Sequence, residues 1–317
     1  MLQQTQIDTV IPYYQRFLRE FPTVEQLAKA RLERVLELWS GLGYYRRARN
    51  LHQAAQELVE KYGGQFPSEM KQACSLPGVG DYTARAVLSI AYNKPLTVLD
   101  GNVARVMARF LALRGNIAER QFRQSVEKNL DLLLSRRSPG NFNQALMELG
   151  QIVCLPRSPH CAQCPLRRWC RGFQTGQPED FPEPRPRRQA EHWHIATAVI
   201  YKNQEVLLCR GLEDGILDDL WNFPSALGQS REESLAQLKR KLRAALGTVP
   251  SLSRADHQLR HNITYRSLQV HVHEGRFGGK TPKGGFRWFQ PRSIEEAAVS
   301  QLARKIAGKL ADSGEKG

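Results

Sequence analysis

The 317-residue chain has no uninterrupted apolar run of about 18–20 residues, the length that a membrane-spanning helix needs. Its first residues, Met1–Thr5, lack the basic and apolar blocks of a secretory signal peptide. Six cysteines in a chain of this length are too few for a disulfide scaffold. We therefore expect a protein of the reducing cytoplasm, with no membrane partner.

Acidic residues are scarce relative to basic ones. The 31 Asp and Glu stand against 46 Lys and Arg, which gives a formal charge of +15. Residues 1–170 carry +9 of this excess and residues 171–317 carry +6, so it does not come from one tail. A basic excess of this size is typical of proteins that bind a polyanion through many phosphate contacts. A solvated surface of mixed charge explains the composition equally well.

Four of the six cysteines are concentrated in a short stretch with the spacing C-x6-C-x2-C-x5-C, namely Cys154, Cys161, Cys164 and Cys170. Four thiolates in one compact loop can hold either a [4Fe–4S] cluster or a single zinc ion. Zinc sites usually contain two C-x2-C pairs, and this sequence has only one. The spacing therefore favours the iron–sulfur cluster, with zinc as the alternative.

Residues 4–170 show apolar positions at helical spacing, separated by short glycine-containing breaks. The expected helices are Val24–Leu38, Leu51–Tyr62, Ala84–Tyr92, Val103–Leu113, Phe122–Leu134 and Phe142–Val153. A proline-rich, charged stretch follows at 176–186 and predicts an extended linker. Beyond it, residues 193–209 and 264–273 alternate like strands, and Ser234–Leu246 and Ile294–Leu310 are expected helices. The sequence thus predicts an all-α domain over 1–174, a linker over 175–191 and an α/β or α+β domain over 192–312.

The segment Leu76–Ala84, with the letters LPGVGDYTA, predicts a helical hairpin. Gly78 and Gly80 would form a tight bend and leave the backbone N–H groups of the second helix bare, which is a site for a phosphate. Eighteen residues after Tyr82, Asp100 stands before another expected helix, whose positive end favours an ionised carboxylate. A simple helix cap is the alternative role for Asp100.

Taken together, these motifs resemble those of adenine DNA glycosylases of the MutY type, in the helix-hairpin-helix superfamily of base-excision enzymes. The resemblance rests on MLQQT at Met1–Thr5, GLGYYRRARN at Gly41–Asn50, the segment Leu76–Val106 and the cysteine loop. It implies a glycosylase that flips adenine out of duplex DNA and hydrolyses its N-glycosidic bond in base excision repair. It also implies a [4Fe–4S] cluster, double-stranded DNA with A opposite 8-oxoguanine or G as partner, and a monomer associated with a bacterial-type nucleoid.

The resemblance also implies roles for individual residues. Asp100 matches the aspartate that stabilises the oxocarbenium-like sugar. Tyr82 stands where bifunctional endonuclease III-type enzymes carry a Schiff-base lysine, so monofunctional hydrolysis is expected. The expected DNA contacts are Gln4, Thr5, Tyr44, Gly78, Gly80 and Asn102.

The family also uses a glutamate that protonates adenine, and its position falls two residues before Met1. The 317-residue sequence does not contain it, and Asp8 is too far away to replace it. We expect either a start placed too far downstream or a mismatch-binding protein without catalysis, and we expect this polypeptide to hydrolyse adenine poorly. An endonuclease III-type enzyme is the other alternative, opposed by Tyr82 and by the second domain.

The second domain resembles the Nudix-like domain with which these enzymes inspect the base opposite adenine. Leu220–Pro224 fits the family's LWxFP segment, but the helix after it lacks the R-E-x-x-E-E core, so no Mg²⁺ site is expected. The family's H-x-F-S-H loop appears with a changed centre, and its expected lesion-recognition residues are Leu259, Arg260 and His261.

Overall fold

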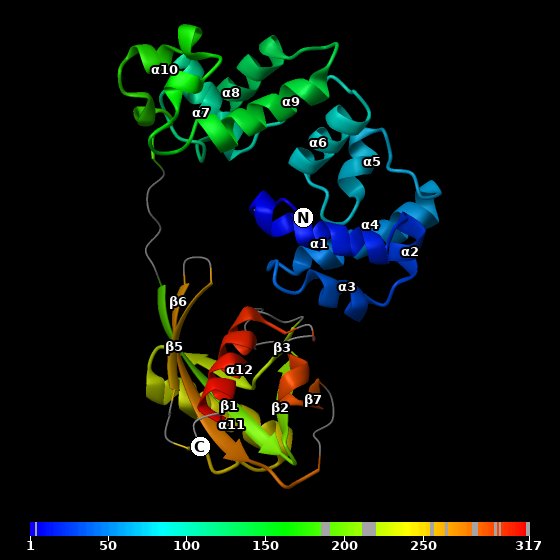
Figure 1. The fold of residues 1–317 in the computed structure, drawn as a ribbon, viewed down its shortest axis with the longest axis vertical. Helices are drawn as coiled ribbons and strands as arrows, with labels where there is room; N and C mark the ends of the chain where they lie inside the picture. The colour runs from blue at the N-terminus through cyan, green and yellow to red at the C-terminus, as the bar shows by residue number, and fades with distance from the viewer. Residues whose placement is uncertain are drawn as a thin grey trace. The chain divides into compact units, whose positions relative to one another are not determined.

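The chain folds into two compact units, which Figure 1 traces from a helical first half to a sheet. One unit comprises Met1–His52 and Arg188–Gly317, and the other comprises Gln53–Arg187. The computed structural model describes residues 1–3, 5–184, 191–210, 220–253, 257–263, 266–280, 285–294, 297 and 299–314. None of the helices in these ranges is long and apolar enough to cross a membrane.

Helices dominate the first half of the chain, as the sequence predicts. The first unit holds α1 (Ile7–Glu20), α2 (Val24–Lys29), α3 (Leu32–Trp39) and the start of α4 (Arg46–Tyr62). The second unit continues with α5 (Met70–Ser75), α6 (Asp81–Ala91), α7 (Gly101–Leu111), α8 (Arg120–Leu133) and α9 (Pro139–Glu148). Short turns follow at η1 (Leu149–Val153), η2 (Cys161–Gln163), η3 (Arg167–Trp169), α10 (Arg171–Gln174) and η4 (Pro178–Asp180).

Two expected helices differ from the observed ones. The stretch Val24–Leu38 is two helices, because Ala30 and Arg31 take extended backbone with ψ of 151° and 136°. The stretch Phe142–Val153 is also wrong as one helix, since α9 ends at Glu148 and the chain continues as the π-helix η1. Apolar spacing alone does not register such a change of pitch.

Apolar packing in the second unit centres on α7 and α8. Val103 and Met107 of α7 pack against Val126 and Leu130 of α8, all fully buried. Phe181, just after η4, packs into the same core. The beginning of the proline-rich stretch is therefore part of this unit, and the domain boundaries at 174 and 191 stay predictions.

The second half of the chain forms one mixed sheet. Its path runs β3-β2-β1-β6-β5, with β4 also paired to β1 and β7 to β2. β1 and β6 are parallel, and the other pairs are antiparallel. The strands are β1 (Glu191–Lys202), β2 (Glu205–Arg210), β3 (Trp221–Asn222), β4 (Ser225–Gly228), β5 (His257–Ile263), β6 (Arg266–Arg276) and β7 (Phe286–Phe289).

Helices cover both faces of this sheet. Along β1, Ile195 and Val199 face a core shared with α12 (Gln301–Gly314), whereas Ala196 and Ala198 face α11 (Arg231–Leu246). This alternation follows from the two-residue period of a strand. The predicted closing helix Ile294–Leu310 begins too early, because a short turn, η5 (Pro291–Ile294), precedes α12. The predicted fold class, an all-α region followed by an α/β domain, is confirmed.

Candidate active site and cysteine pocket

The predicted helical hairpin is formed by α5 and α6. Gly78 has φ +76°, a backbone conformation that favours glycine, and the N–H of Val79 donates to the carbonyl of Leu76 at 3.1 Å to close the bend. Gly80 precedes α6, and a Cβ there would meet open space. The first N–H groups of α6 therefore lie at an uncovered helix N-terminus, where the helix dipole favours an anion.

Asp100 is the N-cap of α7. Its Oδ1 accepts a hydrogen bond of 2.7 Å from the backbone N–H of Val103. Asn102 Nδ2 lies 3.5 Å from Oδ2, and the side chain is half-buried. The cap and the active-site interpretation are therefore compatible, because the cap engages only one of the two carboxylate oxygens.

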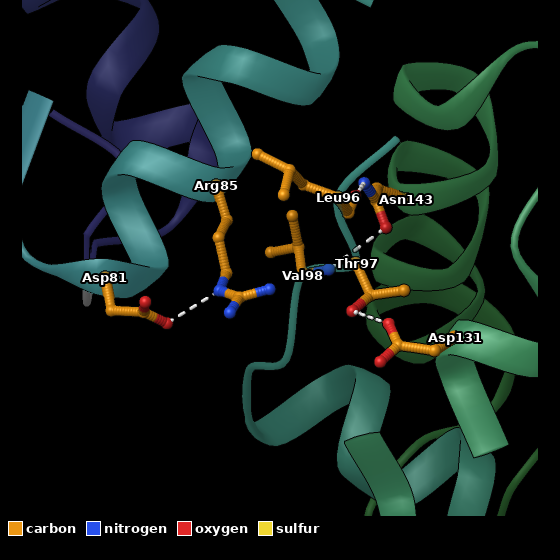
Figure 2. Close-up of polar contacts among 7 residues, drawn as sticks. All are labelled: Asp81, Arg85, Leu96, Thr97, Val98, Asp131 and Asn143. Atoms are coloured by element: carbon orange, nitrogen blue, oxygen red, sulfur yellow. Dashed lines mark hydrogen bonds and ion pairs between the residues drawn. The ribbon is translucent and has the colours of Figure 1, made fainter. Parts of the chain in front are cut away.

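The segment before α7 is fixed by side chains of two other helices, as Figure 2 shows. Asn143 of α9 accepts from the N–H of Val98 at 3.2 Å and donates to the carbonyl of Leu96 at 2.8 Å. The hydroxyl of Thr97 donates to Asp131 of α8 at 2.7 Å. Asn143 is 1% exposed, so it satisfies buried backbone groups that water cannot reach.

Tyr82 lies in the first turn of α6, and its hydroxyl donates to the sulfur of Met147 at 3.8 Å. Burial raises the pKa of Tyr82 above its usual value, and the negative charge of Asp100 adds to this shift. The structure thus places Tyr82 and Asp100 close enough to interact electrostatically. A phenol without an amine cannot form a Schiff base.

Arg105 connects this site to the cysteine loop, and the sequence reasoning missed it. Its Nη2 donates to Oδ1 of Asn102 at 3.0 Å and to the carbonyl of Gly150 at 2.7 Å, while Nε donates to the carbonyl of Cys154 at 2.8 Å. A Cβ on Gly150 would lie 2.6 Å from Cβ of Asn102, so η1 approaches α7 more closely than a side chain allows. The sequence did offer one indication of Arg105, because it is a basic residue about one turn into the helix that the expected cap Asp100 begins.

The four clustered cysteines line a single pocket, and none forms a disulfide. Burial raises the pKa of the Cys161 and Cys170 thiols, and negative charge on the neighbouring cysteines raises it further. A cationic centre would relieve this mutual repulsion. The pocket is otherwise lined by Arg109, Val153, Pro159, Arg167, Phe173 and Pro178.

Arg109, at 3% exposed, is a buried cation beside these thiols. Its Nη1 donates to Sγ of Cys154 at 3.4 Å and to the carbonyl of Leu155 at 2.6 Å. Its Nη2 donates to the carbonyl of Pro156 at 2.9 Å, and its Nε to that of Phe181 at 3.0 Å. The arginine therefore holds the start of the cysteine loop and supplies positive charge to an anionic ligand set.

The donor set can be tested against the two candidate metal groups. A tetrahedral zinc site with Zn–S bonds of about 2.3 Å needs its four sulfurs within roughly 4 Å of one another. Among the residues that the structure describes, no three His, Cys, Asp or Glu side chains are arranged closely enough for a single metal ion. Four thiolates in one loop are a donor set that both an iron–sulfur cluster and a zinc ion accept, so the choice between the two stays a prediction.

The remaining expected DNA contacts belong to the first unit. Gln4 lies outside the described residues. Thr5 Oγ1 accepts from Arg47 at 3.1 Å, and Tyr44 is 55% exposed with φ +49°. Arg47 thus brings the segment of Thr5 and the loop of Tyr44 together.

The expected lesion-recognition residues lie on β5, which pairs regularly with β6 and is a strand rather than a loop. Leu259 is buried in the core shared with α12, whereas Arg260 is exposed. Burial lowers the pKa of the half-buried His261, and Lys305 contributes to the shift. Of Leu259 and Arg260, the arginine is the one that a base could reach.

The helix at the position of a Nudix box is α11, and its acidic residues serve as caps. Ser230 Oγ accepts from the N–H of Glu233 at 3.1 Å, and the Glu233 carboxylate accepts from the N–H of Gln229 at 2.7 Å. Ser230 is thus the N-cap of α11, and the Glu233 carboxylate bonds back to the residue before the cap.

Comparisons with known proteins agree with this arrangement. Residues 1–131 match the family described as "HhH-GPD superfamily base excision DNA repair protein", and residues 196–309 match the NUDIX domain family. The adenine DNA glycosylase of Rattus norvegicus is 34% identical over 96% of this chain and 69% of its own length. The chain belongs to the adenine DNA glycosylase family.

Other members of the family show the same relationship. The Homo sapiens adenine DNA glycosylase is 33% identical over 96% of the chain and 66% of its own length. The enzyme of Buchnera aphidicola subsp. Acyrthosiphon pisum is 32% identical over 84% of the chain and 75% of its length. Among solved structures, a thermostable thymine-DNA glycosylase aligns with TM-score 0.49 and 25% identity over 55% of this chain and 80% of its own. The chain is accordingly a DNA glycosylase, a hydrolase of N-glycosyl bonds that acts on adenine in base excision repair.

Proposed function

We propose that the chain removes adenine paired with 8-oxoguanine or guanine, with Asp100 and Tyr82 at the scissile bond. The observation that carries this proposal is the placement of Asp100 at the N-terminus of α7, close enough to Tyr82 for its charge to act on the phenol. The hairpin at Gly78 and Gly80 holds the phosphates of the strand that carries the adenine. Asn102 lies beside Asp100 and contacts the same nucleotide.

The proposed role of Asp100 is electrostatic. As adenine leaves, positive charge develops on the deoxyribose, and an ionised carboxylate next to it lowers the energy of that state. Its Oδ1 is engaged by the cap at Val103, which fixes the orientation of the carboxylate. Water then adds to the sugar and leaves an abasic site. Tyr82 supplies no amine, so the strand stays intact.

The partner base would be read by the Nudix-like domain and the wedge residues. Gln4, Thr5 and Tyr44 would enter the stack beside the flipped adenine. Exposed Arg260 on β5 is the donor offered to guanine-type acceptors, with His261 next to it and Leu259 holding the strand to the core.

We further propose that Cys154, Cys161, Cys164 and Cys170 hold a [4Fe–4S] cluster. When bound, the cluster would cross-link the four cysteines, and Arg105 and Arg109 would hold the start of this loop against α7. Iron and zinc analysis of the purified chain tests this assignment. About four irons per chain are expected from four thiolate ligands, whereas one zinc per chain would contradict it.

The principal experiment is single-turnover release of adenine from a duplex with A opposite 8-oxoguanine, measured both in residues 1–317 and in a chain extended at its N-terminus through the family's glutamate. Asp100→Asn keeps the cap acceptor and removes the charge, so release should fall by orders of magnitude while duplex binding persists. Retention of full activity in Asp100→Asn would contradict the role of this residue. A nicked strand in place of an abasic site would contradict the role of Tyr82.

The same assay identifies the proton donor for adenine. A chain extended at its N-terminus with the glutamate that the family resemblance calls for should release adenine faster than residues 1–317 alone. Equal rates would place the acid within the 317 residues. Mismatch binding by both chains without release would favour the binding-protein alternative.

A further inference from the structure

Arg47, in the first turn of α4, makes most of the described side-chain hydrogen bonds to the first five residues of the chain. Its guanidinium donates hydrogen bonds to both of the segments that the wedge would use. Nη1 donates to the carbonyls of Met1 (2.8 Å) and Gln3, and Nη2 donates to Thr5 Oγ1 (3.1 Å) and the carbonyls of Leu42 (3.3 Å) and Gly43 (3.3 Å). One planar group therefore joins the chain start to the loop before Tyr44.

Tyr44 is presented by this loop in an unusual way. Its side chain is 55% exposed, and its φ of +49° is rare for a bulky residue. Such a conformation persists only where the surroundings fix it. The Arg47 guanidinium lies 5.5 Å from the Tyr44 ring and 5.4 Å from the Trp39 ring, and Trp39 Nε1 donates to the carbonyl of Gly43 at 3.1 Å.

A direct phosphate contact would be the simplest role for an arginine in a DNA-binding protein. Here both terminal nitrogens already donate to protein acceptors, and Nε is buried without a partner among the described residues. Of the roughly five N–H groups of a guanidinium, all but the one on Nε belong to the terminal nitrogens. The acceptors at Met1, Gln3, Thr5, Leu42 and Gly43 already use them, so none is left for DNA. The guanidinium is half-buried, and its terminal N–H groups point at oxygen acceptors of the protein.

We propose that Arg47 is a positioning residue that holds the Met1–Thr5 segment and the Tyr44 loop together as one preformed DNA wedge. The inference rests on the proposed function, because it takes Thr5 and Tyr44 as wedge residues. It assigns to Arg47 a task that lysine cannot perform, since a single ammonium cannot reach acceptors arranged on both edges of a planar fork.

The test measures binding and wedge insertion without chemistry. The 317-residue chain is titrated with a duplex carrying a non-hydrolysable 2′-fluoroadenosine opposite 8-oxoguanine, with 2-aminopurine beside it to report unstacking by fluorescence. The variants are Arg47→Lys, Arg47→Ala, Tyr44→Ala and the double variant Tyr44→Ala with Arg47→Ala. Arg46→Ala removes the same charge from the exposed neighbouring position and is the matched control.

We expect Arg47→Lys and Arg47→Ala to lose about tenfold in affinity for the mismatch duplex, together with the fluorescence rise. Arg46→Ala should weaken mismatch and undamaged duplexes alike and keep the fluorescence rise. Because part of the effect of Arg47 passes through Tyr44, the double variant should lose less affinity than the sum of the losses in Tyr44→Ala and Arg47→Ala. Thermal unfolding of each variant separates this effect from global loss of the fold, and Arg47→Lys keeps the charge and the aliphatic stem.

Several results would overturn the proposal. One is a normal fluorescence rise in Arg47→Lys, and another is an additive loss in the double variant. A third is an equal loss in Arg46→Ala, which would make the effect one of charge. If the unaltered chain fails to prefer the mismatch duplex over an undamaged one, the proposed function itself is wrong and the Arg47 inference is overturned with it.

Discussion

Arg105 Nε donates a hydrogen bond of 2.8 Å to the carbonyl oxygen of Cys154, the first residue of the cysteine cluster. The same side chain bonds to Asn102, whose amide lies 3.5 Å from the carboxylate of Asp100. The cysteine loop and the N-terminus of α7 are therefore joined through one guanidinium. A change in the conformation of the cysteine loop would therefore reach the proposed catalytic carboxylate through these hydrogen bonds.

Replacing Arg105 should disturb both ends of this connection. Arg105→Ala leaves the carbonyls of Gly150 and Cys154 without this donor and frees Asn102. Residues that orient a site from behind cost about 10–100-fold in activity or metal affinity when replaced. Single-turnover adenine release and iron content should both fall, whereas Arg114→Ala, at an exposed position just after α7, should change neither. Normal values of both in Arg105→Ala would contradict the link.

The contact between η1 and α7 gives a second prediction. In Gly150→Ala the new Cβ would lie 2.6 Å from Cβ of Asn102, so one element must move. We expect slower adenine release and a lower unfolding midpoint, because the displacement is transmitted to the cap at Asp100. Gly308→Ala in α12, where a Cβ meets open space, is the control and should stabilise by about 0.4–1 kcal/mol. Equal unfolding midpoints for the two variants would show that the close approach relaxes freely.

Asn143 carries the third prediction. Asn143→Ala would strand the N–H of Val98 and the carbonyl of Leu96 in a buried region, at a cost of about 1–3 kcal/mol for each unsatisfied group. Urea unfolding should show this loss. Asn141→Ala, exposed on the same helix, should unfold near the midpoint of the unaltered chain. Similar midpoints for the two variants would mean that water reaches the segment before α7.

The sequence was informative where function depends on residues close together in the chain. The cysteine spacing predicts a compact loop, and the letters LDGNV at Leu99–Val103 predict a helix cap at Asp100. Both are short-range structures, so the local sequence is enough to predict them. Arg109 and Asn143 escaped prediction because their partners are about 45 to 72 residues away. Each is also a polar residue on an apolar helix face, which sequence patterns treat as an exception. The lesion-reading loop predicted at 257–261 is instead a strand. Its conformation depends on pairing with β6, a separate element that a short motif does not reveal.

The sheet contains a histidine pair whose geometry leads to the last prediction. Nδ1 of His194 on β1 lies 3.0 Å from Nε2 of His271 on β6, with ring planes 7° apart and centroids 5.3 Å apart. The centroid separation is close to the nitrogen–nitrogen distance plus the distance from each ring centre to its own nitrogen. The two nitrogens therefore lie near the line that joins the ring centres. This arrangement fits an N–H···N hydrogen bond in which one imidazole donates and the other accepts.

Acid should therefore weaken this domain. Burial lowers the pKa of His271 below its usual value, and the charge of Arg231 on α11 adds to the shift, with Glu232 opposing it. The unfolded chain then binds more protons than the folded one, so the free energy of unfolding falls as pH drops from about 6.5 through the folded pKa. His271→Gln should flatten this dependence in thermal unfolding scans across that range. The exposed His192→Gln should leave it intact, and an unchanged slope in His271→Gln would assign the acid sensitivity to other groups.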